Sequence, residues 1–293
     1  MIWAVAGVIA LSAGVLGLCW WGSGIVMHPP AMSPMWVFPE QFGLRYEKVS
    51  FKTRDGLELR GWFIPSPTGD PRTLVMCHGW GDNKGELLKM TGFLNERPGL
   101  NLLYFDFRSH GESEGEFTTI GGLETQDFDA AVEWLRREKP GLAARAGVFG
   151  LSMGAAVAVA SLPNHPDLRC AVVESPFSDY AGVVERWSWN NLRIPRFPLI
   201  DIAMVLLRLR VGNPRVDRFN PVEAAPRIAP RPVLMIAGEK DDLMPVWDVR
   251  RVYEAAREPK QLWIVPDARH AKCRETAGLE YDTRVAAFFD KHL

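Results

Sequence analysis

The stretch GVFGLSMGAAVAVA, residues 147–160, decides the fold because it joins two kinds of element around one serine. The apolar run before Ser152 is typical of a strand, and the alanine-rich run after it favours a helix. A turn tight enough to carry Ser152 at its apex leaves no room for side chains two positions away, which explains Gly150 and Gly154. The pattern predicts a reactive serine on a sharp strand-to-helix turn. The alternative is an ordinary serine that caps a helix.

Strands and helices alternate on both sides of this junction. Short apolar runs lie within RTLVMCHG, GLNLLYFDFRSHG, RAGVFGLSMG, LRCAVVESPF, RPVLMIAGEKDD and PKQLWIVPDARH, and such runs are typical of strands buried on both faces of a parallel sheet. Helical patterns cover residues 84–96, 121–139, 152–161, 246–257 and 276–292. YEKVSFKTRDGLELRGWFIPS, with Asp55-Gly56 at its centre, predicts a β-hairpin.

These patterns predict an α/β fold with a doubly wound, mostly parallel sheet and an N-terminal β-hairpin. One stretch breaks the alternation, because about residues 180–226 are longer than a strand-helix crossover needs. We expect an inserted, mostly helical cap there. One ordinary crossover helix with long loops is the alternative.

Composition limits the classes of protein to consider. The 34 basic and 35 acidic residues nearly cancel, so no field of one sign suggests a nucleic-acid partner. Cysteines 19, 77, 170 and 273 form no CxxC pair and no metal-ligand cluster, which argues against a disulfide framework and a metal site. The glycines form neither a dinucleotide-binding motif nor a phosphate-binding loop, so we expect no cofactor.

The N-terminus is an uncharged apolar segment. Residues 2–21 carry no charge and are long enough as a helix to cross the hydrocarbon core of a bilayer. We expect a single-pass transmembrane anchor over residues 1–27, a proline-rich linker over 28–43 and the globular domain over 44–293. A cleaved signal peptide is the alternative, although the basic segment that usually begins one is absent. Basic residues lie only on the C-terminal side, which slightly favours a cytoplasmic domain.

The polar residues that follow the predicted strands form a coherent set. Ligands of an open parallel sheet bind beyond the carboxyl ends of its strands. His78, Asp106, Ser152, the pair Asp241 and Asp242, and His270 all fall there. Serine, then aspartate, then histidine, each just after a strand, is a known chain order of a catalytic triad.

The pieces HGWGDN, DFRSHGESEG, GLSMGA, GEKDDLMP and DARHAKC make the sequence resemble the α/β-hydrolase superfamily of serine hydrolases over residues 44–293. Within that superfamily it looks most like the membrane-anchored α/β-hydrolase-domain proteins. The resemblance implies that Ser152 is the nucleophile and His270 its general base. The family spelling Gly-x-x-Asp places Asp241 as the acid that orients the histidine, with its neighbour Asp242 as the alternative.

The resemblance also assigns the supporting groups. The backbone N–H groups of Trp80 and Met153 would form the oxyanion hole, with Gly79 and Gly81 freeing the turn that aims one of them. His78 and His110 would be structural. Asp106 and Arg108 are expected to brace loops rather than react.

The predicted activity is hydrolysis of carboxylic esters or thioesters through an acyl-enzyme. The apolar stretch 198–212 either packs on the core as a structural helix or covers the cleft and contacts acyl chains or lipid, with nearby arginines reaching headgroups. Together with the anchor it suggests an acyl or lipid-like substrate. A membrane-tethered serine peptidase, an acyltransferase and a non-catalytic interaction protein on the same scaffold are the alternatives.

Overall fold

The computed structural model describes residues 1–29, 32–213 and 216–293. The described residues form an eight-stranded sheet in the order β1-β2-β4-β3-β5-β6-β7-β8. The strands are β1 Glu47–Lys52, β2 Glu58–Ile64, β3 Thr73–Cys77, β4 Asn101–Phe105, β5 Ala146–Leu151, β6 Ala171–Glu174, β7 Val233–Gly238 and β8 Lys260–Val265. Strands β3 to β8 pair in parallel, whereas β1 pairs with β2 and β2 with β4 in antiparallel fashion. The predicted α/β fold with an N-terminal hairpin is therefore confirmed.

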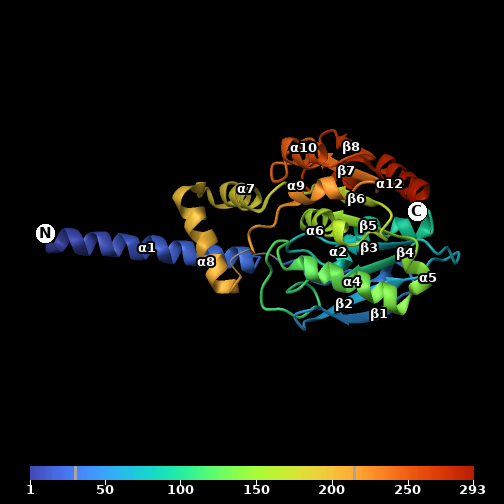
Figure 1. Cartoon of the computed structure of the whole chain (residues 1–293), viewed down its shortest axis with the longest axis horizontal. Coiled ribbons are helices and arrows are strands. Elements are labelled where there is room, and N and C mark those ends of the chain that lie inside the picture. The colour runs from blue at the N-terminus through green and yellow to red at the C-terminus, as the bar shows by residue number, and fades with distance from the viewer. Residues whose placement is uncertain (30–31, 214–215) are drawn as a thin grey trace.

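Helices cover both faces of this sheet (Figure 1). The face with Val75, Val148 and Val173 packs on α4 Glu124–Glu138, α6 Met153–Ser161 and α10 Val246–Ala255. The opposite face, with Leu74 and Phe149, packs on α2 Lys84–Thr91, α3 Phe93–Glu96 and α12 Leu279–His292. Short elements complete the chain: η1 Pro39–Phe42, α5 Pro140–Ala143, η2 Leu162–Asn164, α9 Pro221–Ala224, η4 Ala225–Arg227 and α11 Cys273–Ala277.

Two predicted helices are divided in the structure. The stretch 84–96 forms α2 and α3, and the stretch 276–292 begins earlier, with α11, and continues as α12. Gly278 separates α11 from α12 with a φ of 55° and a ψ of −127°, a positive-φ conformation that glycine adopts at no steric cost.

The segment between β6 and β7 contains α7 Tyr180–Leu192, the turn η3 Arg196–Ile200, in which Phe197 is extended, and α8 Asp201–Val211. We call these three elements the cap. The cap lies beside the C-terminal half of the long helix α1 Ile2–Met27, whose N-terminal part extends away from the rest of the chain (Figure 1). Among the described residues α1 is the one helix long and apolar enough to cross a membrane. Its N-terminal part is exposed, whereas Val26 and Met27 join the core.

The side chains of Arg210 and Cys19 connect α1 to the cap. The Arg210 guanidinium donates to the carbonyl of Trp20 and to Ser23 Oγ, each at 3.0 Å, and lies 4.5 Å from the Trp20 ring centre. The Cys19 thiol donates to the Leu199 carbonyl at 3.4 Å. The apolar stretch 198–212 therefore packs on α1, and Arg210, one of the arginines that the lipid-contact alternative places at headgroups, hydrogen-bonds to that helix.

Candidate active site

Ser152 lies between β5 and α6 in a strained conformation. Its φ is 52° and its ψ is −113°, a region that side-chain-bearing residues seldom adopt and that costs of order 1–3 kcal/mol. The backbone is held there by Ser152 N–H, which donates to the Glu174 carbonyl at 2.8 Å. The predicted sharp turn thus presents the serine at the carboxyl edge of the sheet.

The two glycines of the motif are required by close backbone contacts. A Cβ at Gly150 would lie 2.6 Å from the Gly154 carbonyl oxygen. A Cβ at Gly154 would lie 2.3 Å from the Cys77 carbonyl oxygen, so any side chain there would separate α6 from β3. Both positions therefore exclude side chains for the steric reason expected of a tight turn.

Ser152, His270 and Asp241 form a hydrogen-bonded series although they come from three different strand ends. Ser152 Oγ is 3.0 Å from His270 Nε2, and His270 Nδ1 is 2.8 Å from Asp241 Oδ2. The Asp241 carboxylate is buried and accepts the N–H groups of Leu243 at 3.0 Å and Met244 at 2.7 Å. These two donors fix its orientation toward the imidazole.

Two further residues lie near this carboxylate. Asp242, the alternative acid, is exposed, and its backbone carbonyl accepts a hydrogen bond from Asn190 at 3.0 Å. Ser175, which the sequence patterns did not single out, donates from its Oγ to Asp241 Oδ2 at 2.9 Å. A signal for it was present, because Ser175 directly follows β6 and therefore lies at the same sheet edge as Ser152.

A pocket of about 320 Å³ opens above Ser152 and His270. Its walls are mainly apolar and include Trp80, Met153, Phe177, Val184, Trp187 and Met244. Met153 begins α6, so its N–H is one of the first-turn donors that have no intrahelical partner. Trp80 and Met153 both line the pocket beside the serine, and their role in an oxyanion hole stays a prediction.

The turn that carries Trp80 is held by the two histidines expected to be structural. His110 Nε2 accepts Gly81 N–H at 3.0 Å, while its Nδ1 donates to the Arg108 carbonyl at 2.7 Å. His78 Nε2 accepts Phe107 N–H at 3.0 Å, and its Nδ1 donates to the Gly79 carbonyl at 2.7 Å. Each ring thus needs one protonated and one bare nitrogen, which is the neutral form.

Of Gly79 and Gly81, the two glycines expected to free the turn, only Gly81 has a backbone conformation that favours glycine. Gly81 has a φ of 77°, which favours glycine. Gly79 has no positive φ, and a Cβ there would be 3.5 Å from the Ser152 Cβ, an ordinary contact. Gly79 therefore leaves space beside the serine, rather than freeing the backbone as we expected.

We predict that the free energy of unfolding depends less on pH in His110→Gln than in wild type. Burial lowers the pKa of His110, so the folded protein binds fewer protons there than the unfolded chain once the pH falls below about 6.5. As the pH falls below that value, this difference lowers the free energy of unfolding of wild type by up to about 1.4 kcal/mol per pH unit. The variant has no titrating group at position 110 and lacks this loss. The variant should be about 1–3 kcal/mol less stable at pH 7.5, with the difference shrinking toward pH 5.5 in urea denaturation.

The matched control is His28→Gln, because His28 is exposed in the segment after α1. It should follow the wild-type stability curve at every pH. A His110→Gln difference that stays constant between pH 7.5 and pH 5.5 would contradict the assignment of a neutral, buried His110.

Asp106 braces loops, as expected, by binding three separate donors. Its carboxylate accepts Lys84 N–H and Glu112 N–H, each at 2.8 Å, and forms an ion pair with the fully buried Lys84 ammonium. Gly111 has a φ of 51°, and a Cβ there would lie 2.2 Å from this carboxylate. No sequence pattern indicated the role of Lys84, because a lysine at the start of a helical stretch is usually exposed.

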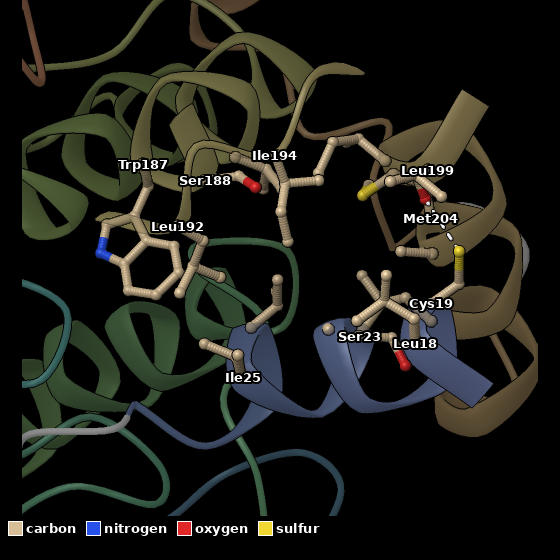
Figure 2. A pocket seen from close by; sticks show the side chains of 16 residues that line it. Leu18, Cys19, Ser23, Ile25, Trp187, Ser188, Leu192, Ile194, Leu199 and Met204 are labelled. Atoms are coloured by element: carbon tan, nitrogen blue, oxygen red, sulfur yellow. Dashed lines mark hydrogen bonds between the residues drawn. The ribbon is translucent and has the colours of Figure 1, made fainter. Parts of the chain in front are cut away.

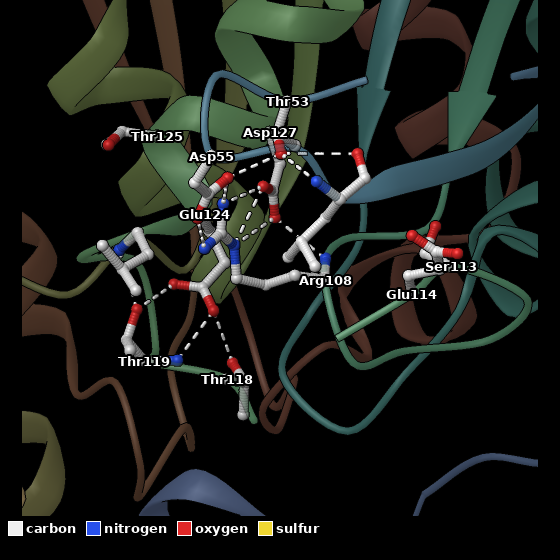
Figure 3. Close-up of polar contacts among 12 residues, drawn as sticks. Thr53, Asp55, Arg108, Ser113, Glu114, Thr118, Thr119, Glu124, Thr125 and Asp127 are labelled. Atoms are coloured by element: carbon white, nitrogen blue, oxygen red, sulfur yellow. Dashed lines mark hydrogen bonds and ion pairs between the residues drawn. The ribbon is translucent and has the colours of Figure 1, made fainter. Parts of the chain in front are cut away.

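Arg108 also braces rather than reacts. Figure 3 shows its guanidinium between the carboxylates of Asp127 and Asp55, at 2.6 and 2.8 Å. Beside it, the buried Glu124 carboxylate accepts Thr118 Oγ1, Thr119 Oγ1 and two backbone N–H groups. This network ties the loop after β4 to α4 and to the β-hairpin.

Comparisons with known proteins agree with the fold. The family model described as serine aminopeptidase, S33, matches residues 70–199. The uncharacterized protein YqkD of Bacillus subtilis is 31% identical over 249 residues, which are 83% of this chain and 80% of that protein. The uncharacterized protein Rv2307c of Mycobacterium tuberculosis is 31% identical over 272 residues, 91% of this chain and 86% of that one.

A solved structure gives the same result. The Pyrococcus furiosus esterase Pf2001 superposes with a TM-score of 0.76 at 28% identity, covering 91% of this chain and 98% of that chain. The chain belongs to the α/β-hydrolase superfamily. The family and the esterase structure together support hydrolase activity.

Proposed function

We propose that the protein is a serine hydrolase of carboxylic esters or thioesters with acyl or lipid-like substrates, and that α1 anchors it to a membrane. The observation that carries the proposal is the continuous hydrogen-bonded series from Ser152 Oγ through His270 to the buried Asp241 carboxylate. A neutral His270 with its proton on Nδ1, facing Asp241, leaves Nε2 free to accept the proton of the serine hydroxyl.

The proposed reaction has two halves. Ser152 Oγ bonds to the substrate carbonyl carbon while His270 takes its proton, and the bond to the leaving alcohol or thiol breaks as His270 returns that proton to it. Water then attacks the acyl-serine, gives one proton to His270 and releases the acid, and His270 reprotonates Ser152 Oγ. The N–H groups of Met153 and Trp80 would stabilise the oxyanion in both halves.

The lining of the pocket favours esters over peptides with a free amino terminus. An aminopeptidase must hold the substrate ammonium group, which in a largely dehydrated site calls for a carboxylate partner. No acidic residue is among the described residues that line the pocket, and most of them are aliphatic or aromatic. This supports an acyl-binding site even though the matched family model carries a peptidase description.

Labelling with a fluorophosphonate tests the proposal. We expect wild type to be labelled covalently at Ser152 and to hydrolyse p-nitrophenyl esters, with little turnover of aminoacyl-4-nitroanilides. Labelling that is absent from folded wild type, or that persists in Ser152→Ala, would refute the serine mechanism. Faster turnover of the anilides than of the esters would refute the substrate class.

A further inference from the structure

A second apolar space lies between α1 and the cap (Figure 2). Its walls include Cys19, Gly22 and Val26 from α1, Val184 and Trp187 from α7, and Leu207 from α8. The free space is about 40 Å³, far smaller than the pocket above Ser152. We call this space the crevice.

The crevice and the pocket above Ser152 share a wall. Val26, Val184 and Trp187 line both spaces. In Figure 2 Trp187 points from α7 into the gap above the end of α1 that carries Ile25. Its ring also packs edge-on against Trp80, with ring centres 5.6 Å apart, which connects the shared wall to the turn beside the serine.

The position of α1 indicates what enters the crevice. From Val26 to Cys19 the helix rises about 10 Å, at 1.5 Å per residue, so the crevice leads from Ser152 toward the exposed apolar part of α1. The cap also exposes large apolar side chains: Phe197 is 80% exposed and Leu209 is 71% exposed. Exposed apolar side chains beside a membrane-length helix are typical of a surface that contacts lipid.

We infer that the crevice binds the acyl chain of a long-chain ester drawn from the bilayer, so that α1 is part of the substrate site as well as an anchor. This inference rests on the proposed function. The scissile carbonyl would lie at Ser152, and the distal methylenes would pass Trp187 and lie along α1. The narrow, apolar crevice selects a single unbranched chain, and its contribution to binding grows with each methylene removed from water.

Gly22 gives the sharpest test. A Cβ at Gly22 would meet no atom within 4 Å, and Gly22 lines the crevice, so we expect Gly22→Leu to fill it. Gly17→Leu is the matched control: its Cβ also meets no atom within 4 Å, and Gly17 does not line the crevice. Ala203→Leu is expected to fill the crevice from the opposite wall. Because Ala203 lies on α8, this variant shows whether an effect of Gly22→Leu arises from the crevice or from a change in α1 itself.

The experiment uses the full chain reconstituted in phosphatidylcholine vesicles. The rate constants for inactivation by dodecyl and by ethyl fluorophosphonate are measured, and their ratio is compared between variants. In this reaction Ser152 Oγ bonds to phosphorus, fluoride leaves, and His270 takes the serine proton. We expect the ratio to fall at least tenfold in Gly22→Leu and in Ala203→Leu, and to stay within twofold of wild type in Gly17→Leu.

The outcomes separate the two proposals. If Ser152 is labelled and the ratio is unchanged in both crevice variants, or falls equally in Gly17→Leu, the crevice does not bind the chain and the proposed function stands. If neither reagent labels Ser152 in folded wild type, the proposed function fails, and this inference fails with it.

Discussion

Ser152→Ala is expected to lower kcat for ester hydrolysis by about 10⁶-fold, and His270→Ala by a similar factor, while the double variant is no slower than either single one. The reason is that the two groups act in one step. Without the hydroxyl there is nothing for His270 Nε2 to deprotonate, and without the imidazole the hydroxyl at 3.0 Å remains a weak nucleophile. Steady-state kinetics with a p-nitrophenyl ester, on protein of confirmed fold, measures all three variants.

Ser161→Ala is the matched control for this series. Ser161 lies at the end of the same helix, α6, and is buried, and among the described residues its Oγ has no hydrogen-bond partner. Removing that hydroxyl should leave kcat within twofold of wild type. Additive losses in the double variant, or more than about 1% of wild-type kcat in Ser152→Ala, would show that the serine and the histidine do not form one catalytic unit.

The sheet and the serine turn were predictable because they depend on local sequence. Buried strands of a parallel sheet appear as short apolar runs, and the strained turn at Ser152 requires the glycines at positions 150 and 154. Strand ends then limited the polar candidates to a few residues. The pairing of His270 with Asp241 was predicted from similarity to the sequence motifs of the α/β-hydrolase superfamily, since no local pattern distinguishes Asp241 from Asp242.

Contacts between distant segments were not predictable in the same way. Lys84 pairs with Asp106 inside the protein, and Ser175 binds Asp241, because loops from different strands converge at one sheet edge. The packing of α1 on the cap was also missed. A helix that is apolar all round has no periodicity that marks the face in contact, so only the structure identifies Val26 as a wall of the pocket.

Asp241→Asn is expected to lower kcat by about 10⁴-fold, whereas Asp242→Asn stays within twofold of wild type. The amide oxygen of the substituted side chain can still accept the N–H groups of Leu243 and Met244, which places its NH₂ group where Asp241 Oδ2 now faces His270 Nδ1 at 2.8 Å. The amide NH₂ group and a protonated His270 Nδ1 would then be two donors facing each other. The imidazole must therefore carry its proton on Nε2 and accept from the amide with Nδ1. That tautomer cannot take the proton of Ser152.

The same geometry predicts that the Asp241→Asn variant folds. Ser175 Oγ, 2.9 Å from Asp241 Oδ2, can rotate its hydroxyl and accept from the amide instead of donating to the carboxylate, so no buried group loses its partner. We therefore expect a urea denaturation midpoint close to that of wild type together with the loss of kcat. A large loss of kcat in Asp242→Asn with little change in Asp241→Asn would refute the assignment, because the exposed carboxylate would then have to reach His270 in the working enzyme.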